Sequence, residues 1–245
     1  MVPPSLSRRH STARVATAAA LLTVLLITAC TPAATLQSGP PVVSEPANER
    51  IVAGSLHGRS GAYLIVRDAA SVVEVRLAEI PGLLYRISTP KDSGLAPRVT
   101  GGDGMVRLGL WRTGDGGPNT VLILLSRRVR WDIRLPSGAG EQRLDLTDGK
   151  VARIDLGSSG LVDVTLPRPV GTVPVRLTGG VGDVTFTGYG PLRFALREGA
   201  RSIRTPWVTS GAAPPDTVLR QPGWTSTPDR YAVYVRTGLG RLTVS

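Results

Sequence analysis

The sequence predicts an all-β fold, organised as a right-handed β-solenoid-like stack with coils of roughly 20 residues; a β-sandwich is the alternative. Three observations support this prediction. Glycine and proline account for 29 and 20 of the 245 residues, while aromatic residues make up only 4%. The apolar content is mostly Val, Leu, Ile and Ala, which alternates with polar residues along short segments. Similar segments also recur along the chain at a nearly constant step.

Residues 1–29 have the three zones of a secretory signal. A basic zone holds three arginines and no acid, residues 15–27 are an apolar stretch, and Thr28-Ala29 supplies small residues at a cleavage position. The apolar stretch is shorter than the about 20 residues that a helix needs to span a bilayer. We therefore expect a signal helix, and a signal peptide over 1–29, rather than a permanent membrane span.

The signal ends in Ile27-Thr28-Ala29-Cys30, which contains the single cysteine of the chain. This segment resembles the lipobox of bacterial lipoproteins. The resemblance implies signal cleavage between Ala29 and Cys30, and attachment of diacylglyceryl and further acyl chains such as palmitate at Cys30. The chain would then be lipid-anchored at the extracytoplasmic face of the bacterial cell membrane. Secretion, or retention by an uncleaved N-terminal helix, is the alternative.

Residues 30–49 predict a lipidated N-terminus followed by a flexible, disordered tether. Residues 31–49 hold four prolines and lack a periodic apolar pattern. A strand packed on the following domain is the alternative. The domain itself is expected over 50–245, with no cysteine and therefore no disulfide.

A weak internal repeat organises this domain. Its template is the segment 180–186 (GVGDVTF), a glycine followed by turn-like residues and an apolar–polar–apolar strand. The matching segments are 160–166 (GLVDVTL), 140–146 (GEQRLDL), 102–108 (GDGMVRL) and 238–244 (GLGRLTV). Because the same side chains recur in register, stacked coils are favoured over successive hairpins. The glycines are expected where the chain reverses or approaches the next coil closely.

A second type of strand recurs along the chain with nearly the same period. Ile133, Ile154, Val175 and Phe194 head similar segments at intervals of 21, 21 and 19 residues. Both strand types alternate apolar and polar residues, so each should bury one face. We expect equivalent residues of successive coils to stack about 4.8 Å apart.

The C-terminal stretch 205–236 breaks the repeat and predicts a loop-and-cap element for the end of the stack. It concentrates Trp207, Trp224, Tyr231 and Tyr234 among prolines. An aromatic platform for sugars is the alternative function of these four side chains.

The residues also resemble known proteins. The run from Leu84 to Ser126, the motif Trp131-Asp132-Ile133 and the glycine-spaced units are similar to uncharacterised exported proteins of high-GC Gram-positive bacteria. More loosely, they resemble the adhesin-like β-solenoid domains of bacterial envelopes. The resemblance implies a β-solenoid fold and a surface location.

The formal net charge is +11, carried almost wholly by arginine. The charge indicates anionic envelope polymers as partners, with another surface protein and the membrane, reached through the lipid, as further partners. The favoured alternative is that the arginines are spread over solvated strand faces. Nucleic acid is not an expected partner, because no binding motif occurs and few aromatic residues are available for base stacking.

No catalytic, cofactor-binding or metal-binding residues are predicted. His57 is the single histidine outside the leader, so a histidine-based metal site or catalytic triad is not expected. The expected function is a non-catalytic surface binding module. One alternative is a structural accessory to a membrane signalling or secretion system. The other is a polysaccharide-acting enzyme, since the repeat places Asp163 and Asp183 at equivalent positions, about 5 Å apart in stacked coils.

Overall fold

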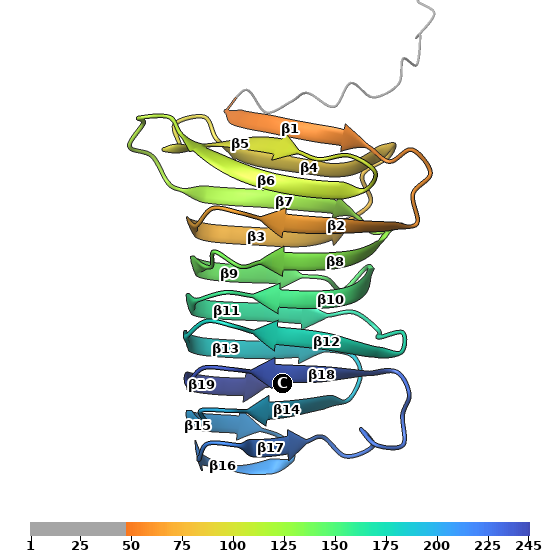
Figure 1. The fold of residues 1–245 in the computed structure, drawn as a ribbon, viewed down its shortest axis with the longest axis vertical. Coiled ribbons are helices and arrows are strands. Elements are labelled where there is room, and N and C mark those ends of the chain that lie inside the picture. Colours follow the sequence, from red (N-terminus) through yellow and green to blue (C-terminus); the bar gives the residue numbers. More distant parts are fainter. Residues whose placement is uncertain (1–47) are drawn as a thin grey trace, which may run out of the picture. The chain divides into compact units, whose positions relative to one another are not determined.

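The computed structural model describes residues 48–245, which form 19 β-strands and no helix (Figure 1). The predicted signal peptide 1–29, its cleavage site at Ala29, the lipidation site Cys30 and nearly all of the predicted tether lie outside the described residues. The described part of the chain contains no helix of the length and apolarity that crossing a bilayer requires.

The strands form two facing sheets that run the length of the stack (Figure 1). In spatial order, sheet A consists of β1 (Glu49–Ser55), β4 (Leu83–Pro90), β7 (Thr120–Ser126), β3 (Ala70–Ala78), β9 (Ala139–Asp145), β11 (Ser159–Leu166), β13 (Val181–Gly188), β19 (Leu239–Val244), β15 (Ala200–Thr205) and β16 (Val208–Ala213). Sheet B consists of β5 (Leu95–Thr100), β6 (Met105–Arg112), β2 (Gly61–Val66), β8 (Arg130–Leu135), β10 (Lys150–Leu156), β12 (Thr172–Leu177), β18 (Arg230–Val235), β14 (Leu192–Leu196) and β17 (Thr217–Arg220).

Each coil is one sheet B strand followed by one sheet A strand. Neighbouring coils pair in parallel, as β8, β10 and β12 do in sheet B and β9, β11 and β13 do in sheet A. A sandwich of successive hairpins would instead make antiparallel neighbours. The all-β solenoid-like prediction is therefore confirmed, with stacked coils in place of hairpins.

The coils do not stack in the order of the sequence. The coil formed by β2 and β3 lies between those formed by β6 with β7 and by β8 with β9. At the other end, the C-terminal coil of β18 and β19 lies between that of β12 with β13 and that of β14 with β15 (Figure 1). Both insertions depend on pairing between distant segments, which the local pattern does not encode.

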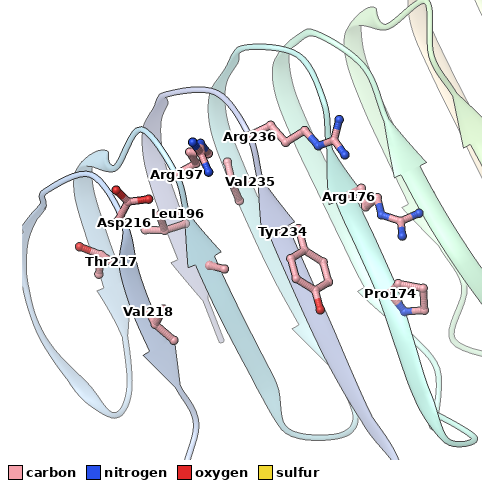
Figure 2. A pocket seen from close by; sticks show the side chains of 11 residues that line it. Pro174, Arg176, Leu196, Arg197, Asp216, Thr217, Val218, Tyr234, Val235 and Arg236 are labelled. Atoms are coloured by element: carbon pink, nitrogen blue, oxygen red, sulfur yellow. The ribbon is translucent and has the colours of Figure 1, made fainter.

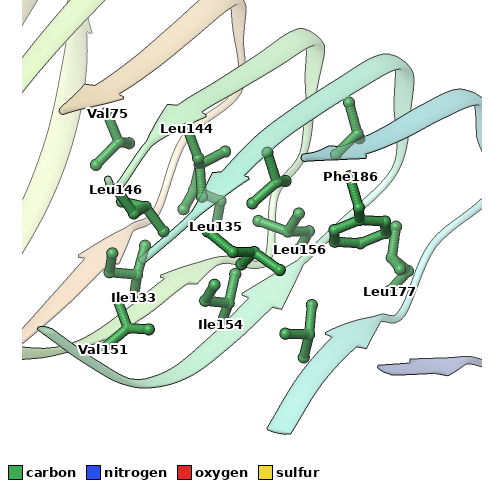
Figure 3. Close-up of a cluster of buried hydrophobic side chains, with 14 of the residues drawn as sticks. Val75, Ile133, Leu135, Leu144, Leu146, Val151, Ile154, Leu156, Leu177 and Phe186 are labelled. Carbon is green, nitrogen blue, oxygen red and sulfur yellow. The ribbon is translucent and has the colours of Figure 1, made fainter. Parts of the chain in front are cut away.

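The core between the sheets is a set of stacked aliphatic columns (Figure 3). Ile133, Ile154 and Val175 lie opposite one another on adjacent strands, as predicted. Val233 of the inserted coil separates Val175 from Phe194. All five side chains are fully buried, so the apolar positions of the repeat do form a continuous core.

The predicted register of sheet A is partly wrong. Segments 140–146 and 160–166 are equivalent, as are 180–186 and 238–244. However, 160–166 aligns with 182–188, two residues later than the predicted match. The coil between them is longer because turns 167–171 and 178–180 each hold one more residue than turns 146–149 and 157–158.

A two-residue shift preserves the inward and outward alternation, so the apolar pattern could not reveal this error. The match of 102–108 was also wrong. Residues 105–108 belong to β6 of sheet B, where they pair with β2, and Arg107 and Leu108 also pair with β5. They do not align with the sheet A strands of the other matching segments.

Antiparallel strands close both ends of the stack. β1 and β4 continue sheet A beyond β7, and β5 continues sheet B beyond β6. At the other end β16 pairs with β15, and β17 pairs with β14. Residues 208–220, part of the stretch expected as a cap, thus lie at this end of the stack. Residues 230–235, expected in the same cap, instead form β18 inside the stack.

Candidate functional site

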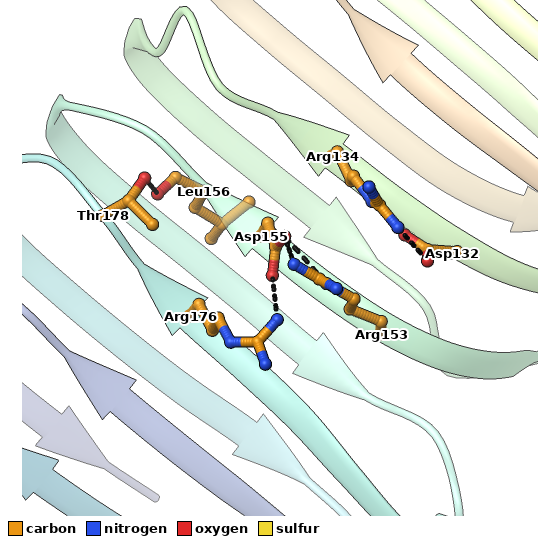
Figure 4. A network of polar contacts seen from close by, with 7 residues as sticks. All are labelled: Asp132, Arg134, Arg153, Asp155, Leu156, Arg176 and Thr178. Carbon is orange, nitrogen blue, oxygen red and sulfur yellow. Dashed lines mark hydrogen bonds and ion pairs between the residues drawn. The ribbon is translucent and has the colours of Figure 1, made fainter.

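The outer face of sheet B carries an alternating pattern of charges across its middle strands (Figure 4). Arg134 donates two hydrogen bonds to the Asp132 carboxylate, at 2.8 and 2.7 Å. On the next strand Arg153 donates to Asp155, which lies opposite Arg134. Arg176 of β12 approaches the same carboxylate at 3.7 Å. Positive and negative groups therefore alternate both along and across these strands.

This arrangement stabilises the charged form of Arg134. The hydrogen bond with Asp132 raises the pKa of Arg134. Asp132 and Asp155 are largely shielded from solvent, with side chains 12% and 15% exposed. Each of these two acids thus has a cation beside it.

Sheet A has a similar ladder on its outer face. Arg143 lies between Glu74 and Asp163 on neighbouring strands. Asp183 lies opposite Arg241, with an ion-pair distance of 3.5 Å. The outward carboxylates of this face are therefore neighbours of arginines.

This register overturns the predicted carboxylate pair. Asp163 lies opposite Thr185 rather than Asp183, and Asp183 lies opposite Leu161. The two-residue difference in coil length displaces one acid from the other. The stacked pair on which the polysaccharide-cleaving alternative depended is therefore not formed.

The alternation of charge breaks down at the C-terminal end of sheet B. β14 and β18 pair with Leu196 opposite Val235, so the next residues, Arg197 and Arg236, are cross-strand neighbours. The Arg197 backbone amide donates to the Val235 carbonyl at 2.9 Å, which holds this register. Arg193 likewise lies opposite Arg220 on β17. Like charges placed directly opposite each other destabilise a sheet.

Beside these neighbours lies a hollow of about 520 Å³, which we call the arginine groove (Figure 2). It is lined by Pro174, Arg176, Ala195, Leu196, Arg197, Asp216, Thr217, Val218, Tyr234, Val235 and Arg236. The bottom of the groove is recessed because the outward-facing side chains there, Pro174 and Ala195, are small. Tyr234 lies between Ala195 and Arg176 on the adjacent strands, and 40% of it is exposed.

The groove is predominantly basic. Within residues 48–245, no carboxylate lies within ion-pair distance of Arg197 or Arg236. Arg176 is shared with Asp155 at 3.7 Å, and Asp216 is the acid of the lining. Three guanidinium groups around a half-exposed phenol make a surface that suits an anion with an apolar face.

A second basic cluster lies close by on the same face. The guanidinium groups of Arg193 and Arg230 lie 5.6 and 4.1 Å from the ring centre of Trp224. Trp224 donates from Nε1 to the carbonyl of Tyr231, and Arg230 donates to the carbonyl of Trp224. These contacts pin the loop between β17 and β18 onto the sheet.

The four aromatic residues predicted as a sugar platform do not share one surface. Tyr231 is fully buried, and its hydroxyl donates to the Pro167 carbonyl at 2.8 Å. Trp207 packs against the core and Trp224 is covered by arginines. Tyr234 is the one that reaches the arginine groove.

The remaining predicted features lie elsewhere. His57 occupies a turn after β1 with a positive φ of 46°. Within the part of the chain that the structure describes, no three His, Cys, Asp or Glu side chains are arranged to hold a metal ion. Sequence reasoning missed Arg197 and Arg236, because they lie far apart in the chain and the inserted coil alone makes them neighbours.

No protein-family model matches this chain. A comparison with curated proteins finds no significant match.

A comparison with solved structures matches three proteins. One is described as a "putative cell adhesion protein" from Clostridium sporogenes, at 15% identity and a TM-score of 0.61, covering 80% of this chain and 98% of that one. Two described as "putative adhesin" come from Bacteroides fragilis (6% identity, TM-score 0.27, 82% and 98% coverage) and Parabacteroides distasonis (8% identity, TM-score 0.21, 81% and 97% coverage). The chain therefore shares its fold with the Clostridium protein over nearly the whole of that protein.

Proposed function

We propose that this protein is a lipid-anchored, non-catalytic module of the cell surface, which binds anionic envelope polymers in the arginine groove. One observation carries the proposal. Arg197 and Arg236 directly follow β14 and β18 and are cross-strand neighbours, whereas Arg134, Arg153 and Arg176 of the middle strands each lie beside an aspartate. Like charges on neighbouring strands are unfavourable, and an anion that binds to both arginines would offset this cost.

Two further features support this assignment. The groove extends across four neighbouring strands of sheet B, which suits a chain-like ligand better than a small enclosed one. The name of the Clostridium protein with the same fold refers to cell adhesion, which agrees with a binding role at a surface.

The proposed location at the membrane rests on Cys30 and the lipobox-like residues before it. Two or more acyl chains hold a protein stably at a membrane, since each buried methylene contributes about 0.8 kcal/mol. Such an anchor would leave the folded domain outside the membrane, within reach of wall polymers.

Binding to an anionic wall-polymer preparation tests the activity. We expect full-chain protein to bind, and binding to weaken as salt is raised. Arg197→Gln and Arg236→Gln should each weaken binding by about tenfold, the loss of one charge-assisted hydrogen bond. Arg143→Gln is the matched control, because it removes the same charge from sheet A. Equal losses in all three variants would contradict a specific groove.

Cell fractionation tests the proposed location at the membrane. The natural chain should be found with the membrane and carry acyl chains detectable by mass spectrometry. Cys30→Ser should lose the acyl chains and leave the membrane fraction. Unchanged membrane association of the serine variant would overturn the lipid anchor and leave the groove proposal intact.

A further inference from the structure

We infer that the ligand of the arginine groove is an acidic polysaccharide with one carboxylate on each sugar, lying across the strands and along the stack. This inference rests on the proposed function and specifies the ligand class of the same site. It follows from the spacing of the arginines and from the position of Tyr234.

The arginines of the groove follow the strand repeat. β12, β18 and β14 are consecutive in sheet B; Arg176 lies in β12, while Arg236 and Arg197 directly follow β18 and β14. Arg176 lies opposite Tyr234, two residues before the position opposite Arg236. Neighbouring strands lie about 4.8 Å apart. One sugar unit of an extended glycan has a similar length, so acid groups on successive sugars would meet arginines on successive strands. Guanidinium groups bind carboxylates through paired hydrogen bonds, which favours such a match.

Tyr234 gives the groove a contact for the sugar ring itself. Its phenol stands over the middle strand, between the short side chain of Ala195 and the arginine of β12. The ring is 40% exposed, so one of its sides is free to pack on the apolar C–H face of a sugar (Figure 2). A polyphosphate or a glycerol-phosphate chain offers charge without such a face.

The groove also sets a length for the ligand. Its lining comes from four consecutive strands, β12, β18, β14 and β17. Three strand spacings of about 4.8 Å amount to roughly 14 Å, or about three to four sugar units. Asp216 and Thr217 lie at the β17 end, where the acid limits how far an anionic chain extends.

Calorimetric titration of the full chain with oligogalacturonates of one to six units tests the inference. We expect affinity to rise with each added unit and to level off at about four. Neutral galactose oligomers of the same length should bind at least tenfold more weakly. A single uronic acid that binds as tightly as the hexamer would overturn the inference.

Variants separate the sugar contact from charge alone. Tyr234→Ala should weaken oligogalacturonate binding about tenfold and leave polyphosphate binding unchanged. Tyr63→Ala is the matched control, since Tyr63 is also half-exposed on the outer face of sheet B but lies outside the groove. Melting curves of both variants check that the fold is retained.

The outcomes distinguish the two proposals. Equal binding of polyphosphate and oligogalacturonate, both unaffected by Tyr234→Ala, would overturn the polysaccharide and leave the anion-binding groove standing. Failure of every anion to bind would overturn both. Length-dependent uronate binding that requires Tyr234, Arg197 and Arg236 would support both.

Discussion

Gly182 and Gly240 face each other on the adjacent strands β13 and β19, so closely that a methyl group on Gly240 would collide with the Gly182 carbonyl. The same relation recurs along sheet A. Gly160 approaches Gly140, and Gly140 approaches Ser71, each at a spacing that leaves little or no room for a Cβ. The sheet A strands β9, β11, β13 and β19 thus share a column of close backbone contacts near their starts.

Gly240→Ala should therefore destabilise the fold by about 2 kcal/mol or more, because the added methyl group forces adjacent backbones apart. Chemical denaturation measures this loss. Gly180→Ala is the control, since a Cβ at Gly180 meets nothing within 4 Å. Equal stability of the two variants would contradict the close contact.

The inserted position of β18 predicts unusual protection at the C-terminal end of the chain. In a serial stack the last coil would fray, and its amides would exchange quickly. Here β18 pairs with β12 on one side and β14 on the other. Hydrogen exchange should show the amides of β18 as slow as those of β12.

Removal of residues 223–245 extends the same prediction. The deletion takes out an internal layer and separates two coils that do not contact each other directly. We expect the shortened chain to lose cooperative unfolding altogether, as followed by circular dichroism. A truncated protein that still melts cooperatively would show that the layer is dispensable.

The charge ladder of sheet B predicts a specific role for Asp155. Its carboxylate accepts from Arg153 and lies near Arg176, and 15% of it is exposed. Asp155→Asn should cost about 1–2 kcal/mol, between the values for exposed and buried pairs. Asp163→Asn is the control, because Asp163 is exposed on sheet A; its change should stay within about 0.5 kcal/mol. A double-mutant cycle with Arg153→Gln measures the coupling.

Tyr231 predicts a loss of stability in alkali. Burial raises the pKa of its phenol above the ordinary value of about 10. Folding therefore favours the neutral phenol, and this contribution is complete below about pH 10 and is lost as pH rises through the folded pKa.

Tyr231→Phe separates this effect from the hydrogen bond. At neutral pH the variant should be less stable by about 1–3 kcal/mol, because the Pro167 carbonyl loses its donor. Above about pH 10 the difference should narrow, since phenylalanine has no proton to lose. Melting temperatures from pH 7 to 11 measure both effects. A gap that is constant across this range would contradict the linkage.

The sequence predicts the strands of this fold well and their order poorly. Alternation of apolar and polar residues identifies both strand types, and Ile133, Ile154 and Val175 stack as expected. That signal is local, because it depends on which side chains must leave water. Pairing of residues 230–235 with strands on either side depends instead on shape and backbone contacts between distant segments.

The candidate site depends on that order. Nothing near Arg236 in the sequence indicates Arg197 as its neighbour, and the two become adjacent when the C-terminal coil enters the stack. The predicted pairing of Asp163 with Asp183 failed for the same reason, because the local pattern does not fix the register between coils. Asp163 and Asp183 sit in similar segments, yet one additional residue in each of two turns moves them apart.

The sequence by itself determined the all-β class, the stacked coils and the aliphatic core, because these follow from composition, glycine placement and period-two burial. The tertiary structure alone decided the order of the coils, the register of sheet A and the placement of three arginines around one groove. A shift of two residues, or the insertion of a coil, preserves which side chains are buried. The hydrophobic pattern is therefore the same for several stackings, and only packing of the whole chain selects one of them.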